Sequence, residues 1–380
     1  MSGTGRSDRS RSDAHPAGEM SIDPRLDPGP LRRLVLLVPG LLYRGAVGLR
    51  NRLYDGGILK ATTLPAPSIA FGNLTVGGTG KTPMTSHVAG LLEAAGYRVG
   101  ILSRGYGRRG RTPLLVSDGR RILADAAAAG DEPWLLARDH PAAGVAVGGD
   151  RIAAAALLRE ALRPEVYLLD DAFQHRRVRR DLNILLVDGG TIFGNGRILP
   201  FGPLREPLSG LRRADAVVLT RGDGAVPGPL ARALERHHPR LPIFEARIAP
   251  TRFVGADGAT ADPGALRGLA IFAFAGIARP DRFFADLEAT GARVLGRRAF
   301  PDHHPYDAGD FDAIARAASA TGAVYLVTTE KDLVRLHGRP PGALPLGTLA
   351  VGVSFTAGDF AGFLLDRLAA IAAARRSDPR

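Results

Sequence analysis

Short apolar runs alternate with amphipathic helical patterns along most of the chain. In its first part, buried strands are predicted at 68–71, 98–102, 144–147, 166–169, 182–187 and 216–219. Helical periodicity separates several of these runs, most clearly at 83–95 and 151–163. Apolar strands that alternate with helices are typical of a parallel sheet with both faces covered. The pattern therefore predicts an α/β fold built on a doubly wound parallel sheet.

A second, shorter series of strands and helices follows and predicts a second, smaller α/β domain. Its strands are expected at 269–275, 293–300, 324–327 and 349–353, and its helices at 279–290, 310–320 and 358–374. Pro, Gly and Asp cluster between the two series, which favours a boundary there. We expect a main domain at 61–240, a linker at 241–265 with a two-stranded ribbon as one option, and the smaller domain at 266–380. The Ala-rich stretch 124–129 is interpreted as loop or frayed helix.

The N-terminal sixty residues have a different pattern. Residues 1–30 are rich in Ser, Arg, Asp, Pro and Gly, which predicts a disordered tail without a signal peptide. Residues 31–60 form a basic apolar segment whose longest uncharged stretch, 34–43, is far short of the ~20 residues that span a bilayer. Two interpretations are open: a helix packed on the protein's own core, or a helix that lies in a membrane interface. The flanking arginines favour the membrane, because anionic lipid attracts them.

Composition narrows the function classes. The 380 residues contain no cysteine, which excludes disulfides and cysteine-based metal sites, and the formal net charge is +12. The only lysines are Lys60, Lys81 and Lys331. The excess of arginine suits phosphates and anionic surfaces. Aromatic residues make up only 6% of the chain and no basic–aromatic module stands out, so we expect no nucleic-acid partner, and no obligate protein partner is indicated.

The first predicted strand leads into a glycine-rich loop, GNLTVGGTGKTP at 72–83. Its end matches a Walker A loop, in which backbone N–H groups face the phosphates of a nucleotide. Lys81 would reach the β- and γ-phosphates, and the Thr82 hydroxyl would bind Mg2+. Thr75 stands where the first glycine of the pattern is expected. The predicted nucleotide-binding residues are Thr75, Val76, Gly77, Gly78, Thr79, Gly80, Lys81 and Thr82. The alternative is an ordinary glycine-rich turn. With this loop, the fold class becomes a P-loop NTPase-like doubly wound sheet.

An apolar strand at 166–169 ends in two carboxylates, Asp170 and Asp171. This is the pattern of a Walker B strand, which places an acid beside the phosphate loop. Neighbouring residues of a strand point to opposite sides, so both acids reach one metal ion only if the backbone turns there. One acid is predicted to serve the metal and the other the substrate or the metal's surroundings. Asp171 could instead cap a turn.

Two further segments contain candidate acid–base groups. Asp131, in the string GDEP at 130–133, precedes a helical pattern and is either the N-cap of that helix or a base for an attacking hydroxyl. His303 and His304, in PDHHP at 301–305, follow a predicted strand of the second domain. They are either surface-loop residues or groups that orient a carboxylate or bind phosphate. Two histidines are too few for a zinc site without other ligands.

Seven motifs follow one another over residues 35–355: 72–73 with 76–83, 103–107, 130–133, 170–175, 199–207, 300–304 and 329–332. In this order they resemble the tetraacyldisaccharide 4'-kinases of lipid A biosynthesis. One position departs from the family pattern, since Ala172 stands where the family usually has glycine.

The resemblance implies an enzyme, a phosphotransferase that uses ATP and Mg2+. The acceptor would be the 4'-hydroxyl of the distal glucosamine in a tetraacylated disaccharide 1-phosphate. Asp131 would be the catalytic carboxylate and His303, chosen over His304 by motif position, its partner. Asp170 and Asp171 would be the magnesium-associated pair. Gln174 and His175 match a motif near the active site, and Arg151 and Arg205 match residues that steady phosphate or substrate. Arg151 could equally be an exposed residue at a helix start.

The family further implies a peripheral enzyme on the cytoplasmic face of a bacterial inner membrane, with a lipid A precursor and the anionic membrane surface as partners. The competing hypothesis is a P-loop GTPase or ATPase that couples hydrolysis to another process at the membrane. A guanine-reading motif would be Asn/Thr-Lys-x-Asp, and the nearest string, TEKD at 329–332, has the wrong order. A non-enzymatic nucleotide-binding scaffold would not need Asp131 and the histidine.

Overall fold

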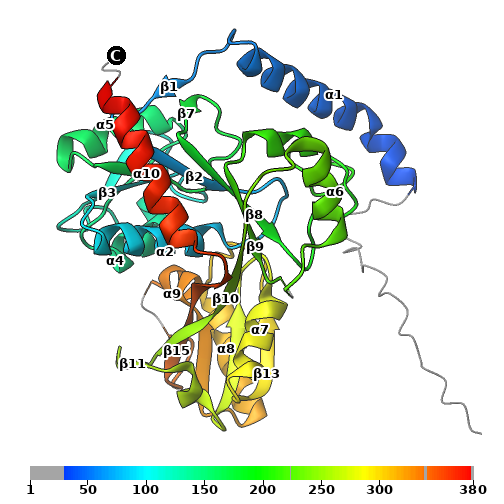
Figure 1. Cartoon of the computed structure of the whole chain (residues 1–380). Helices are drawn as coiled ribbons and strands as arrows, with labels where there is room; N and C mark the ends of the chain where they lie inside the picture. The colour runs from blue at the N-terminus through cyan, green and yellow to red at the C-terminus, as the bar shows by residue number, and fades with distance from the viewer. Residues whose placement is uncertain (1–29, 223, 338–339, 378–380) are drawn as a thin grey trace, which may run out of the picture.

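The computed structural model describes residues 30–222, 224–337 and 340–377 (Figure 1). Of the predicted disordered tail, residues 1–29 lie outside the described part of the chain, and Pro30 begins helix α1 (Pro30–Asp55). The remaining elements form two α/β halves, the larger one at the top of Figure 1 and the smaller one at the bottom.

The upper half contains the predicted strands and helices with ends shifted by few residues. Its strands are β1 (Thr62–Thr63), β2 (Ser68–Gly72), β3 (Val99–Ser103), β4 (Leu114–Asp118), β5 (Gly144–Val147), β6 (Val166–Leu169), β7 (Val178–Arg179), β8 (Leu182–Asp188) and β9 (Ala216–Thr220). Its helices are α2 (Lys81–Ala94), α3 (Ala126–Ala129), α4 (Asp131–Asp139), α5 (Arg151–Ala161) and α6 (Gly228–His237), with a 3₁₀ helix at Leu208–Arg213. Strands β1, β4 and β7 and helix α6 were not predicted from the sequence.

The lower half also follows the predicted order. Its strands are β10 (Ile243–Val254), β11 (Thr260–Ala261), β12 (Ala270–Ala275), β13 (Arg293–Ala299), β14 (Tyr325–Thr329) and β15 (Leu346–Ala357). Its helices are α7 (Pro280–Ala289), α8 (Ala308–Thr321), α9 (Glu330–Arg335) and the C-terminal α10 (Phe360–Ser377), with a 3₁₀ helix at Pro263–Leu266.

One sheet runs through both halves. Its strand order is β13-β12-β14-β15-β10-β9-β8-β2-β6-β3-β5-β4, with β11 paired to β10, while β1 and β7 form a separate two-stranded sheet. Most neighbours are parallel, and β4 with β5 and β10 with β15 are antiparallel. Every residue of β8 is buried, as expected of a strand with both faces covered. The doubly wound α/β prediction is confirmed.

The segment between the halves differs from the predicted linker. Residues 243–254 form one twelve-residue strand, β10, which pairs with β9 of the upper half and β15 of the lower half. Helix α10 also departs from the expected division. It leaves the lower half and packs Phe360, Leu364 and Leu368 into the same apolar core as Val88 and Leu92 of α2 (Figure 1). Within 241–265, the end of β10 pairs antiparallel with β11, with Phe253 opposite Ala261, and β10 as a whole also belongs to the shared sheet. The chain returns to the upper half at its end.

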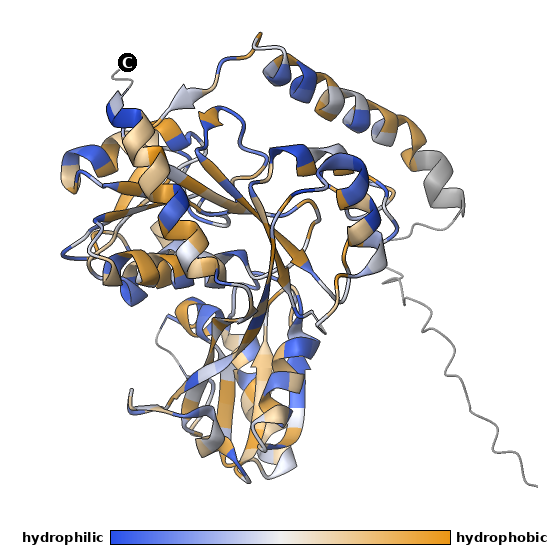
Figure 2. Ribbon diagram, in the orientation of Figure 1, coloured by the Kyte–Doolittle hydropathy of each residue, from blue (hydrophilic) through white to orange (hydrophobic). Residues whose placement is uncertain are grey.

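Helix α1 runs along one side of the upper half and continues through Pro39. It is anchored to the body at a few points: Val47 is buried, and a Cβ on Gly40 would lie 2.1 Å from the Phe201 ring, so only glycine fits there. Other apolar side chains of the helix are exposed, among them Leu37, Val38, Leu41, Leu42 and Leu49. Figure 2 shows hydrophobic and hydrophilic residues alternating along this helix. Within the described residues, no helix is long and apolar enough to cross a membrane.

Candidate active site

The glycine-rich loop lies between β2 and α2, as predicted. Gly77 and Gly80 have φ of +110° and +86°, a conformation that L residues with side chains rarely adopt. A Cβ on Gly80 would also lie 2.0 Å from Ile248 of β10, so the loop closely contacts the strand that joins the halves. Thr75 and Val76 are held at the start of the loop by backbone pairing with residues 203–204. The loop ends at Gly80, the N-cap of α2. At this N-terminus, backbone N–H groups and the helix dipole favour an anion.

Lys81 is the first residue of α2 and its ammonium group faces acceptors. Its Nζ lies 3.3 Å from Asn73 Oδ1 and 3.7 Å from an Asp171 carboxylate oxygen. Burial lowers the pKa of Lys81, and the charge of Asp171 opposes this effect. The lysine thus has a carboxylate partner in the position where a nucleotide phosphate would supply negative charge.

Asp170 and Asp171 follow β6 and reach the same loop, because the backbone turns at Asp171, which has φ of +47°. Asp170 is buried and accepts hydrogen bonds from the hydroxyls of Thr82 (3.4 Å) and Thr85 (3.2 Å). Asp171 accepts from Arg205 Nη1 at 2.9 and 3.1 Å. The backbone turn that both acids need in order to reach one site is therefore present.

The donor set around Asp170 fits Mg2+. Burial raises the pKa of Asp170, and the nearby charges of Glu132 and Asp171 raise it further. A divalent cation beside this carboxylate would reverse that effect. Thr82 and Asp170 offer the oxygen ligands that Mg2+ prefers, and this ion usually completes its shell with substrate phosphates and water. Accordingly, the described residues contain no cluster of three or more His, Cys, Asp or Glu that would hold a metal by themselves.

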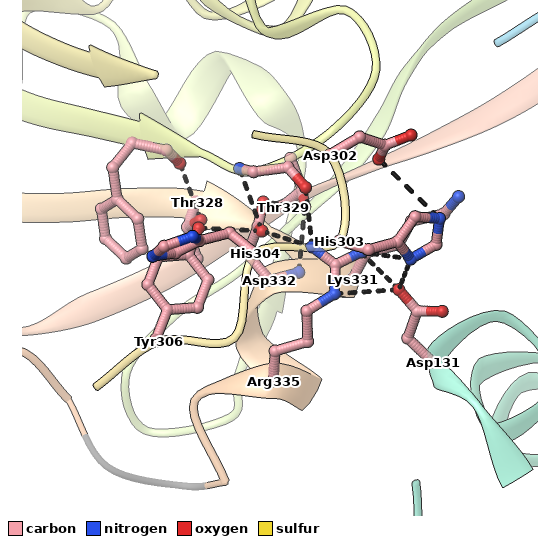
Figure 3. A network of polar contacts seen from close by, with 12 residues as sticks. Asp131, Asp302, His303, His304, Tyr306, Thr328, Thr329, Lys331, Asp332 and Arg335 are labelled. Atoms are coloured by element: carbon pink, nitrogen blue, oxygen red, sulfur yellow. Dashed lines mark hydrogen bonds and ion pairs between the residues drawn. The ribbon is translucent and has the colours of Figure 1, made fainter. Parts of the chain in front are cut away.

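Asp131 lies at the start of α4 and is nearly buried (8% exposed). The expectation that it is the N-cap is wrong: Gly130 is the cap, with φ of +92°, and Asp131 is the first helical residue. Its Oδ2 contacts Nδ1 of His303 (3.3 Å) and the guanidinium of Arg335 (Nε at 3.0 Å) (Figure 3). Residues from α4, from the loop after β13 and from α9 therefore meet at one carboxylate.

The electrostatics of this group keep Asp131 ionised. Burial alone would raise the pKa of Asp131, but the hydrogen bond with His303 and the charges of Arg335 and Lys331 outweigh it and hold the pKa below its usual range. The same hydrogen bond raises the pKa of His303. His303 also packs against the Tyr106 ring, with centroids 4.9 Å apart. His304, in contrast, bonds Asp310 at 2.7 Å.

Three charged residues of this site were not predicted as site residues. Lys331 of α9 contacts Glu132, and Arg335 contacts Asp131. The charge of Glu132 raises the pKa values of Lys81 and Asp170, and α4 packs against α2, the helix that follows the phosphate loop. The rarity of lysine and the motifs 130–133 and 329–332 were signals for Lys331 and Glu132. Nothing in the sequence distinguished Arg335 from the many other arginines.

Arg335 belongs to a buried network that fixes its position. Its Nη1 donates to the Gly276 carbonyl (2.7 Å) and to Asp332 (3.0 Å). Asp332 is fully buried and also accepts from the Tyr306 hydroxyl at 2.9 Å (Figure 3). The guanidinium is thereby held between a structural carboxylate and Asp131.

Three further predicted residues, Gln174, His175 and Arg151, lie near the Asp170–Asp171 pair. Gln174 donates to the Asn73 carbonyl (2.8 Å) and to Glu206 (3.0 Å), which ties the loop to residues 199–207. His175 is neutral at physiological pH, because burial and the charge of Arg151 lower its pKa to about 4. Arg151 is only 2% exposed, so its interpretation as an exposed helix-start residue is wrong. Its guanidinium contacts the Gly148 carbonyl, and burial lowers its pKa to about 10.

Comparison with known proteins finds one family in a family model, in curated relatives and in a solved structure. Residues 32–369 match the family model described as LpxK, tetraacyldisaccharide-1-P 4'-kinase. A tetraacyldisaccharide 4'-kinase of Anaeromyxobacter dehalogenans (strain 2CP-C) is 47% identical over 317 residues, which cover 81% of this chain and 83% of the relative. One from Pelobacter propionicus is 47% identical over 309 residues, covering 80% and 84%. A crystal structure of LpxK from Aquifex aeolicus in complex with ATP superposes with a TM-score of 0.71 at 34% identity, over 90% of this chain and 99% of that one.

Proposed function

The chain belongs to the tetraacyldisaccharide 4'-kinase family, and from this premise we propose how its residues perform the reaction. It is an ATP-dependent kinase of lipid A biosynthesis that transfers phosphate to a hydroxyl group. The acceptor that we propose is the 4'-hydroxyl of the distal glucosamine in a tetraacylated disaccharide 1-phosphate. One observation supports the assignment: helix α4, which begins with Asp131, the partner of His303, packs against α2, which begins with Lys81 at the end of the Walker loop.

ATP would be held by the loop 75–82 and by Lys81. The loop amides and the N-terminus of α2 face the phosphates, and Lys81 would exchange Asp171 for the β- and γ-phosphates. Thr82 and Asp170 would hold Mg2+, with Asp171 beside them. When bound, Mg2+ would neutralise charge on the transferred phosphoryl group. Arg205, released from Asp171, is then placed to steady a phosphate.

Asp131 would accept the proton of the attacking hydroxyl. A general base must be ionised and held in position, and both conditions are met by the contacts with His303 and Arg335. His303, whose pKa is raised by Asp131, would donate a hydrogen bond from Nδ1 to the carboxylate and hold it in place, while the proton taken from the hydroxyl stays on Asp131. The two halves contribute one partner each, and Asp131 and His303 are already in contact. A movement of the lower half over the bound acceptor would serve to exclude water.

The acyl chains of the acceptor have an apolar cavity close by. A space of about 550 Å3 lies between α1 and residues 196–208, lined by Leu37, Leu41, Ile198, Leu199, Phe201 and Leu208 among others. The same loop places Arg205 on Asp171, so an acyl chain in this cavity would lie next to the phosphate site. Together with the exposed apolar face of α1, this supports a peripheral membrane enzyme. We propose the cytoplasmic face of the inner membrane as its location, because the donor ATP is available there.

The test is transfer of labelled γ-phosphate from ATP to tetraacyldisaccharide 1-phosphate in mixed detergent micelles. We expect a labelled lipid product with the wild type and none with Lys81→Ala. Hydrolysis of ATP that depends on Lys81 without any lipid product would reject the proposed acceptor and favour an NTPase that drives another process.

A further inference from the structure

A second cavity, of about 480 Å3, lies where the end of α1 meets the sheet of β1 and β7. It is lined by four cations, Lys60, Arg176, Arg179 and Arg180, together with Tyr54 and Leu59 among others. The kinase reaction derived above uses none of these four cations. The end of α1 and strands β1 and β7, which carry or flank them, lie in the upper half (Figure 1).

The walls of this cavity are built by specific contacts. Arg176 donates to the carbonyl of Asn51 (3.0 Å) and to Asp55 (2.7 Å), and its guanidinium lies over the Tyr54 ring. The opposite wall is held by parallel pairing of β1 with β7, in which Thr63 is opposite Arg179. The end of α1 is thus tied to the segment that follows the Asp170–Asp171 pair, and the cations are held near one another.

The positive charge of the cavity is only partly neutralised. Arg176 forms an ion pair with Asp55, whereas within the described part of the chain Lys60, Arg179 and Arg180 have no carboxylate partner. The buried Nε of Arg180 has no hydrogen-bond partner there either. Its Nη1 donates to the carbonyls of Ala172 (3.3 Å) and Phe173 (3.1 Å). Burial and the charges of Arg213 and Arg176 lower the pKa of Arg180 to about 10, although the charges of Glu206 and Asp215 act in the opposite direction. A phosphate would supply both the charge and the acceptors.

The surroundings indicate where such a phosphate comes from. Ile58 is 72% exposed and Leu59 lines the cavity, and both lie just beyond α1 with its row of exposed apolar side chains. Apolar side chains beside unneutralised cations are the combination that binds an interface of anionic lipid, where the chains enter the bilayer and the cations meet headgroups.

We propose that Lys60, Arg176, Arg179 and Arg180 form a binding site for the phosphate headgroup of an anionic membrane phospholipid, which docks the C-terminal end of α1 on the membrane. The site would orient the enzyme so that the apolar cavity along α1 faces the lipid phase. This inference rests on the proposed peripheral location, but its test measures binding and does not require kinase activity.

The test uses the full chain with the double substitution Lys60→Gln and Arg179→Gln, two exposed residues whose side chains make no hydrogen bond with described residues. Arg293→Gln with Arg316→Gln, exposed residues of the lower half, removes the same charge elsewhere. Co-sedimentation is measured with phosphatidylcholine vesicles, with and without phosphatidylglycerol. We expect the first variant to lose about tenfold or more of the phosphatidylglycerol-dependent binding, and the control to keep it.

Two results would overturn the proposal. Equal losses in both variants would mean that binding follows net charge and not this cavity. Unchanged vesicle binding, with a raised KM for the disaccharide 1-phosphate in neutral detergent micelles, would assign the cavity to the substrate's own phosphate. Failure of γ-phosphate transfer by the wild type would reject the kinase assignment without affecting this measurement.

Discussion

At the scale of residues, Asp131 is the group on which the proposed chemistry depends. Asp131→Asn keeps the shape of the side chain but removes the base, so we expect turnover to fall by about 10²- to 10⁴-fold. The α4 helix should persist, because Gly130 and not Asp131 is its cap. Turnover and the circular dichroism spectrum are measured together. Near-normal turnover in a folded Asp131→Asn variant would show that another group takes the proton.

The Asp131→Asn substitution should also change how the free energy of unfolding depends on pH. The pKa of Asp131 is lowered in the folded state. Its contribution to the free energy of unfolding is therefore present above about pH 4 and is lost as the pH falls through the pKa of the folded state. The pKa of His303 is raised, so its contribution is present below about pH 6.5 and is lost as the pH rises through the folded value. The free energy of unfolding in urea should therefore differ more between wild type and Asp131→Asn at pH 6 than at pH 8. A difference independent of pH would argue against the pair.

Arg335 is inferred to be a positioning residue for Asp131. Arg335→Gln removes a positive charge from the carboxylate, so the pKa of Asp131 should rise and the acid limb of the kcat/KM profile should move to higher pH. Arg335→Lys should restore part of the shift. Arg138→Gln is the matched control, because Arg138 joins α4 to α9 through Glu330 without touching Asp131. An equal shift in the control would reduce Arg335 to a structural role.

At the scale of elements, α1 is packed on the body at one side and exposed at the other. Val38 and Leu42 are 64% and 68% exposed, so replacing both with Ser leaves the core intact. Burial of each side chain in a membrane interface contributes roughly 1.5 kcal/mol or more, so the double variant should lose more than tenfold of its vesicle binding. Val324→Ser with Val351→Ser, exposed in the lower half, is the control. Binding that is equal in both variants would remove α1 from the membrane contact.

At the scale of the whole molecule, the continuous sheet has a thermodynamic consequence. Strands β9, β10 and β15 are hydrogen-bonded across the two halves, and α10 returns to the core of the upper half. Neither half can unfold without breaking the shared strands, so calorimetry should give a single transition. Two separate transitions would show that the halves are independent.

The nucleotide site should also be visible in the stability of the whole molecule. Saturating ATP with Mg2+, at about 100 times its Kd, should stabilise the wild type by about 2.7 kcal/mol and Lys81→Ala far less.

The sequence by itself determined the features that depend on neighbouring residues. Strands such as 144–147 and 166–169 were predicted to the residue, because buried parallel strands are continuous apolar runs. The loop ending in Lys81 and Thr82 and the acid pair after β6 were predicted likewise, since their chemistry lies within a few consecutive residues. The family followed from the order of seven such motifs.

Only the tertiary structure decided what depends on distant residues. The strand order, the place of β10 inside one sheet and the return of α10 result from packing that no local period encodes. The contact of Asp131 with Arg335 joins residues 204 positions apart, and the burial of Arg151 reverses its interpretation from sequence. The physical reason is the same throughout: hydrophobic periodicity records whether a residue is buried, whereas its partner is selected by the three-dimensional arrangement of the charges around it.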